Sequence, residues 1–222
     1  MEGLRRRVAE KKARGLYGVD ALMAASTEDG DEPFGLDELE TLRELAVQRV
    51  ELDVTTSTKP VVGGINGVAV GAGLGLAMAT DVRLVARSAR LMAGYTRIGG
   101  SPDAGLTITL PQAMGYEKAM RFMMENRTLL GEEAVAWGMA GEVVDDAAFA
   151  ERLAAYCQQL CEWSPITLRL LKRGVSRSYE TTDLESQLRF EVANIGRAFR
   201  SEDGQEARRA FLEKRKPVFQ GR

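Results

Sequence analysis

The sequence predicts an α/β fold, and three observations support that prediction. An apolar strand over residues 60–65 leads through a glycine turn into an apolar helix that begins near Gly71. Two further short apolar segments, 82–86 and 90–93, are typical of buried strands. Almost every segment beyond Glu117 has the apolar spacing of a helix. Strands that alternate with helices indicate an α/β core, and the C-terminal part then forms a helical layer.

The N-terminal segment has a basic part followed by an acidic part. Residues 1–15 carry a dense group of basic side chains, which we interpret as the exposed face of a short helix. A nucleic-acid-binding patch is the alternative, but no aromatic side chains lie among these basic residues to stack on nucleobases. Acidic side chains gather over residues 26–40, which predicts a surface loop, and a helix is expected over 36–54.

The later elements follow from the same periodicity. A helix is expected over 105–114, and Pro165 suits the first turn of a later helix. Ser201 lies where an N-terminal cap is needed. The helices expected beyond Glu117 cover 117–125, 131–137, 147–163, 165–179, 183–199 and 203–213.

Composition excludes several classes of protein. The chain has 222 residues, is 45% hydrophobic and carries a net charge of −2, so it can bury one substantial core without a general attraction for nucleic acid or anionic lipid. No apolar run approaches the roughly 20 residues that a membrane-spanning helix needs. The N-terminus is charged where a secretory signal is apolar. We therefore expect a cytoplasmic protein with neither a nucleic-acid nor a membrane partner.

The chain contains no histidine, which limits its chemistry. Ser-His and Cys-His nucleophiles and histidine-bound metals are excluded, so carboxylate, Tyr, Cys or Lys must move protons. Cys157 and Cys161 share one face of a predicted helix but cannot complete a usual zinc site alone. We expect no metal, and we expect both thiols to be buried.

The glycine turn is the strongest chemical signal. Gly71, Gly73 and Gly75 alternate between the strand and the helix, and such a turn exposes backbone N–H groups that can stabilise an oxyanion. A phosphate cradle is one alternative, although no Lys-Ser or Lys-Thr pair follows as in a P-loop. Close packing of helix against strand is the other alternative, because glycine permits it.

Five ordered segments between Gly18 and Arg222 resemble the crotonase family, also called the enoyl-CoA hydratase/isomerase superfamily. The segments are Gly18-Val19-Asp20, Gly71-Ala72-Gly73, Ile98-Gly99-Gly100-Ser101-Pro102-Asp103-Ala104-Gly105, Asn126-Arg127-Thr128-Leu129 with Glu133-Ala134-Val135-Ala136-Trp137-Gly138-Met139, and Phe211-Leu212-Glu213-Lys214-Arg215-Lys216-Pro217. The resemblance implies a spiral core of ββα units over 1–115 and a helical C-terminal region over 116–222. That region would form a homotrimer or a dimer of trimers.

The same resemblance implies an acyl-CoA thioester as ligand, with coenzyme A as part of the substrate and no separate cofactor. The amides of Val19 and Ala72 would hold the thioester oxygen while an enolate forms. Substrate contacts would come from Asp20, Ala21, Leu22, Gly71, Tyr95, Phe211 and Lys214. For Lys214, Arg215 and Lys216 the alternative is a solvated helix end.

The reaction is inferred from departures from the family pattern. Hydratases of this family use two glutamates, and the corresponding positions here are Gly75 and Tyr95, which makes hydration the less favoured reaction. Asp103 resembles the aspartate of isomerase-type members, which would move a proton between two carbons of an enoyl group. Alternatively, Asp103 caps a helix that begins near Ala104. Family dehalogenases need a histidine that this chain lacks.

The N-terminus supports a rival interpretation. Only seventeen residues precede Gly18, so the opening strands of the sheet are expected to be missing or encoded upstream of Met1. A shortened relative could be a non-catalytic subunit that binds acyl-CoA or an active paralogue.

Overall fold

The computed structural model describes residues 47–222. Helix α4 (Val47–Thr56) contains the end of the helix expected over 36–54, whose beginning lies outside the described residues. The predicted basic segment, the acidic loop and the first oxyanion turn at Gly18 also lie outside them. Residues 51–222 form one structural unit.

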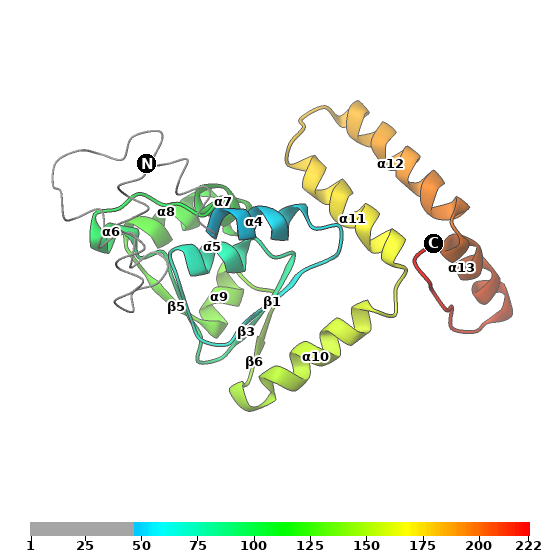
Figure 1. Cartoon of the computed structure of the whole chain (residues 1–222). Coiled ribbons are helices and arrows are strands. Elements are labelled where there is room, and N and C mark those ends of the chain that lie inside the picture. Colours follow the sequence, from blue (N-terminus) through cyan, green and yellow to red (C-terminus); the bar gives the residue numbers. More distant parts are fainter. Residues whose placement is uncertain (1–46) are drawn as a thin grey trace, which may run out of the picture. The chain divides into compact units, whose positions relative to one another are not determined.

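Within residues 47–222, the strands form two three-stranded sheets (Figure 1). The first is parallel, in the order β1 (Val62–Ile65), β3 (Val82–Ala86) and β6 (Glu142–Val144). The second contains β2 (Val68–Val70), β4 (Arg90–Met92) and β5 (Thr128–Leu130), with β2 parallel and β5 antiparallel to β4. In each of the first two passes, the chain adds one strand to each sheet before a helix follows, and in the third pass a helix separates the two strands.

This repeat of two strands and a helix produces a ββα spiral. The chain runs β1, β2 and α5 (Ala72–Met78), and then β3, β4 and the short helix α6 (Tyr95–Ile98). Leu84, Val85 and Leu91 from β3 and β4 are almost fully buried, so both sheets contribute to one hydrophobic core. The structure therefore confirms the predicted α/β class.

Short helices cover this core. They are α7 (Leu106–Met114), α8 (Tyr116–Met124), α9 (Gly131–Trp137) and α10 (Phe149–Leu160), with a 3₁₀ turn (Asp146–Ala148) before α10. Leu110, Phe122 and Met139 are fully buried and complete the core. The expectation that Cys157 and Cys161 are buried was wrong, since both thiols are exposed. The side of α10 that carries them faces solvent, which periodicity alone did not reveal.

Three further helices end the chain: α11 (Pro165–Ser178), α12 (Leu184–Arg200) and α13 (Glu202–Glu213). Pro165 occupies the first turn of α11, as predicted. The Asp183 side chain accepts hydrogen bonds from the first N–H groups of α12. Ser201 accepts from Gly204 N–H, which confirms its capping role for α13. No helix within 47–222 is both long and apolar enough to cross a membrane.

Lys172 joins α11 to the start of the spiral core. Its ammonium lies 2.9 Å from Asp81 Oδ2 and donates to the carbonyls of Val54 and Lys59 at 3.0 and 3.3 Å. Asp81 Oδ2 also accepts from Val61 N–H at 2.7 Å, just before β1. Only 8% of the Lys172 side chain is exposed, whereas 28% of the Asp81 side chain is, so the ion pair is buried on the lysine side and open to solvent on the other.

Replacing Lys172 by Met should destabilise the fold. The methionine keeps an apolar stem but loses the cation beside Asp81 and the hydrogen bonds to the Val54 and Lys59 carbonyls, and hydrogen bonds to charged groups are worth roughly 1.5–3 kcal/mol. Urea unfolding of Lys172→Met and of Lys118→Met, which alters an exposed lysine of α8, measures the difference. Equal stability of the two variants would contradict this role for Lys172.

Candidate active site

Tyr95 and Asp103 form the centre of the candidate site. Tyr95 is the first residue of α6 and is 9% exposed, and its hydroxyl donates a hydrogen bond to Asp103 Oδ1. Burial, followed by this hydrogen bond, raises the pKa of Tyr95, so the phenol keeps its proton and remains a donor. Asp103 lies on an exposed loop, and its carboxylate is anchored at one oxygen only among the described residues.

The residues after Asp103 have an uncommon backbone conformation. Ala104 has φ of 53° and Gly105 has φ of 69°, both in the left-handed region. For alanine this conformation costs roughly 1–2 kcal/mol, and such strain persists only where surrounding contacts hold it. The N-cap of α7 is Gly105, with no side-chain hydrogen bond. The alternative that Asp103 caps this helix was therefore wrong, because the carboxylate is turned to Tyr95 instead.

Close packing of α5 against the strained loop holds that conformation. A Cβ added at Gly75 would lie 2.3 Å from Ala104 Cβ and 2.6 Å from the Ala104 carbonyl oxygen, closer than real contacts allow. No side chain fits at position 75 without displacing the loop. Close packing, one of the alternatives for the glycine turn, therefore applies to Gly75.

The other glycines of the turn have different surroundings. Gly71 has φ of 54°, and a Cβ added there would lie 3.7 Å from the Tyr95 hydroxyl, so the turn lies next to the Tyr95–Asp103 pair. Ala72 begins α5, and the first N–H groups of a helix have no partner within it. The structure thus brings Gly71, Tyr95 and Asp103 together, with Ala72 adjacent to Gly71. The predicted residues Val19, Asp20, Ala21 and Leu22 lie outside the described residues.

Glu51 is a residue of this site that the sequence reasoning missed. It comes from α4 and is 8% exposed, and its Oε1 has no hydrogen-bond partner among the described residues. The same Oε1 lies 2.8 Å from the position of a Cβ on Gly75. Burial, followed by the negative charge of Asp103, raises the pKa of Glu51 to about 7. Glu51 lies three residues before Val54, so the two residues share one face of the expected helix. This spacing was the signal in the sequence for an inward-facing carboxyl.

The C-terminal residues predicted to bind coenzyme A lie on α13. Phe211 is 83% exposed, and Lys214 ends the helix with a left-handed backbone. Within 47–222, no hydrogen bond or ion pair links either residue to Tyr95 or Asp103. Their role in binding coenzyme A stays a prediction.

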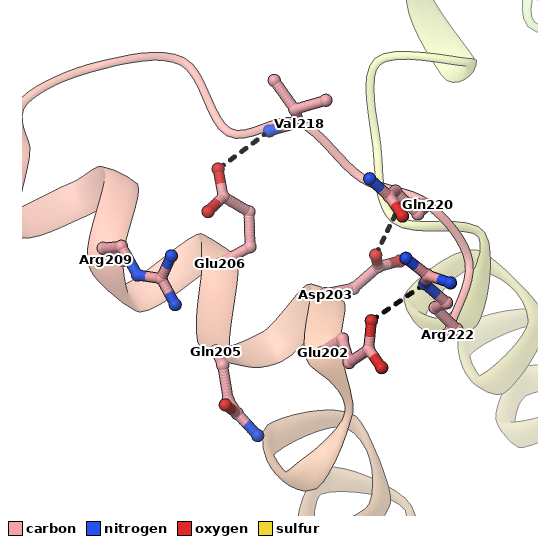
Figure 2. Close-up of a pocket in the computed structure, with 8 residues that line it drawn as sticks. All are labelled: Glu202, Asp203, Gln205, Glu206, Arg209, Val218, Gln220 and Arg222. Carbon is pink, nitrogen blue, oxygen red and sulfur yellow. Dashed lines mark hydrogen bonds and ion pairs between the residues drawn. The ribbon is translucent and has the colours of Figure 1, made fainter.

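A cavity of about 350 Å³ lies between α13 and the C-terminal tail (Figure 2). Its carboxylates are already used to bind the tail: Asp203 accepts from Gln220 N–H at 2.7 Å, and Glu206 accepts from Val218 N–H at 3.1 Å. Ser164 at the start of α11 also donates to Asp203. These contacts fix the end of the chain, so we assign the cavity a structural role.

Replacing Gly75 by Ala should disturb the loop that carries Asp103. Overpacking of this kind lowers the free energy of unfolding by roughly 1–3 kcal/mol. Gly73→Ala is the matched control, because a Cβ at Gly73 meets nothing within 4 Å. Thermal and urea unfolding compare the two, and a Gly75→Ala variant as stable as Gly73→Ala would show that the packing is not tight.

Comparison with known proteins places this chain in a family. The family model described as enoyl-CoA hydratase/isomerase matches residues 26–222. The chain is 38% identical over 164 residues to 1,2-epoxyphenylacetyl-CoA isomerase of Escherichia coli (strain K12), covering 74% of this chain and 62% of that protein. It is 32% identical over 219 residues to a probable enoyl-CoA hydratase of Rhodobacter capsulatus, covering 99% of this chain and 85% of that one.

Solved structures agree with this placement. An enoyl-CoA hydratase from Bacillus anthracis superimposes with a TM-score of 0.79 at 28% identity, covering 85% of this chain and 72% of that one. The family match over residues 26–222 covers both the ββα spiral and the C-terminal helices. The structural similarity confirms the crotonase-like fold that the sequence motifs implied. The chain therefore belongs to the enoyl-CoA hydratase/isomerase family.

Proposed function

We propose that this chain is an enzyme that acts on acyl-CoA thioesters, and that its reaction is the isomerisation of an enoyl-CoA. The observation that carries this proposal is the Asp103 carboxylate, anchored by Tyr95 beside the glycine turn that begins α5. An aspartate held at one oxygen has a second oxygen available for proton transfer. The isomerase named among the relatives also acts on a CoA thioester, which supports the choice.

The proposed reaction needs a single base. Asp103 removes a proton from the carbon between the thioester and the double bond of a 3-enoyl-CoA. The electron pair of that C–H bond moves toward the thioester oxygen and gives a dienolate, which the amides of Ala72 and Val19 hold. Asp103 then returns the proton two carbons further along the chain. Each oxyanion donor of this kind is worth roughly 3–4 kcal/mol, and the reaction is redox-neutral, so it needs no further cofactor.

The closed space at position 75 supports isomerisation over hydration by the usual family arrangement. The resemblance gives hydratases one glutamate at that position, where Ala104 here leaves no room for any side chain. The second glutamate position carries Tyr95, which donates to Asp103 instead of receiving a proton from water. The site therefore lacks both glutamates of the hydratases and keeps a single acid–base group, the Asp103 carboxylate.

Replacing Asp103 by Asn should remove most of the activity. The amide keeps the shape of the side chain but cannot accept the proton, and loss of a general base costs roughly a hundred- to ten-thousandfold in rate. The measurement is kcat/KM for conversion of a 3-enoyl-CoA to the conjugated 2-enoyl-CoA, followed by ultraviolet absorbance. Asp53→Asn, which changes an exposed aspartate of α4, is the matched control.

Two outcomes would contradict the proposal. If Asp103→Asn retains the activity of the unaltered chain, another group is the base. If neither protein turns over the substrate but calorimetry detects acyl-CoA binding, the chain is instead a non-catalytic binding subunit.

We also propose that the protein assembles as a homotrimer. Helix α12 presents Leu188, Val192, Ile195 and Phe199 at helical spacing, and each of these side chains is more than half exposed in the single chain. Apolar stripes of this extent mark surfaces that are covered in an assembly. We choose a trimer over other oligomers because the resemblance to the family implies trimers.

Light scattering should give three times the mass of one 222-residue chain. Ile195→Asp should shift the population toward monomers, because a charge buried at an interface is costly. Arg197→Asp, which alters an exposed residue on another side of α12, should keep the trimer. A monomeric unaltered protein would contradict the proposal.

A further inference from the structure

The Glu51 carboxyl is buried, and none of residues 47–222 neutralises it. Glutamates on a helix usually face water, yet this side chain is buried and its Oε1 accepts no hydrogen bond from residues 47–222. The backbone of Glu51 is satisfied separately, since its carbonyl accepts from the Thr55 hydroxyl at 3.0 Å. An unpaired buried carboxyl is expensive, and such groups gather where a protein uses them.

The groups that face Glu51 give it a negative environment. The loop before α7 contributes the Asp103 carboxylate, α6 contributes the Tyr95 hydroxyl, and α5 contributes only Gly75. No lysine or arginine among the described residues forms an ion pair with Glu51. A negative charge on Glu51 therefore acts mainly on the Asp103–Tyr95 pair.

The absence of a side chain at position 75 makes this arrangement possible. The point where a Cβ would stand on Gly75 is 2.8 Å from Glu51 Oε1 and 2.6 Å from the carbonyl of Ala104, the residue after Asp103. The glutamate thus reaches the back of the Asp103 loop through space that any other residue would fill.

We propose that Glu51 is a positioning residue that promotes proton uptake by Asp103, an inference that rests on the isomerase function proposed above. Two carboxylates held near each other repel, and transfer of the substrate's proton to Asp103 relieves that repulsion. The Tyr95 hydrogen bond acts in the opposite direction, because it stabilises the Asp103 anion. Glu51 offsets this stabilisation and keeps Asp103 reactive as a base.

The pH dependence follows from the charge of Glu51. Below its pKa of about 7 the side chain is protonated and neutral, so it exerts no repulsion on Asp103. As the pH rises through this value, Glu51 ionises and proton uptake by Asp103 becomes more favourable. The value of kcat/KM should therefore rise with pH through about 7 and level off above it.

Glu51→Gln tests the inference, because the amide keeps the shape but cannot ionise. We expect kcat/KM of this variant to be flat from about pH 6 to about pH 8.5 and several-fold below that of the unaltered chain at the upper end. Glu180→Gln changes an exposed glutamate and should keep the rising profile. Thermal unfolding at each pH verifies that all variants are folded. A Glu51→Gln variant with the profile of the unaltered chain would overturn the inference while leaving Asp103 as the base.

A second measurement does not depend on turnover. In protein labelled with carbon-13 at the glutamate carboxyls, one signal should titrate near pH 7, be missing in Glu51→Gln and titrate at lower pH in Asp103→Asn. An unchanged midpoint in Asp103→Asn would overturn the coupling of the two carboxyls. Coupled carboxyls in a chain that does not isomerise 3-enoyl-CoA would support the pair but overturn the proposed function.

Discussion

The contact between Gly75 and Ala104 is the constraint on which the site depends. It brings the start of α5 against the loop that follows α6, so the glycine turn and Asp103 meet although they are far apart in sequence. Ala104 is held in a left-handed conformation there, which turns the preceding Asp103 toward Tyr95. The same contact leaves room for the Glu51 carboxyl behind the loop. A larger residue at position 75 would disturb the meeting of the glycine turn with Asp103, the orientation of Asp103 toward Tyr95 and the room for the Glu51 carboxyl.

Local signals predicted most of the fold. The glycine turn, the apolar strands and the caps at Pro165 and Ser201 depend on neighbouring residues, and each is found close to where it was expected. Strand β6 lies in a region expected to be almost wholly helical, because three residues are too few to establish a period of two. The division of the chain after residue 115 stays a prediction, and β5 and β6, from beyond it, pair with β4 and β3.

Side-chain environments were harder to predict than elements. The exposure of Cys157 and Cys161 and the burial of Glu51 depend on which face of a helix another element covers, and a single sequence does not contain that information directly. The hydrogen bond from Tyr95 to Asp103 joins two residues that sequence reasoning had selected separately, one for substrate contact and one for proton transfer. The family motifs indicated the candidate site, whereas the burial and charge of its side chains depend on tertiary packing that the motifs do not describe.

A crystal structure of the complete protein with a bound acyl-CoA tests the central claim most directly. The account predicts that the thioester oxygen accepts a hydrogen bond from Ala72 N–H at about 3 Å. It also predicts that the Asp103 oxygen not bound by Tyr95 faces the carbons that exchange the proton, at about 3–3.5 Å. A thioester bound away from the glycine turn, or an Asp103 carboxylate directed away from the acyl chain, would contradict it.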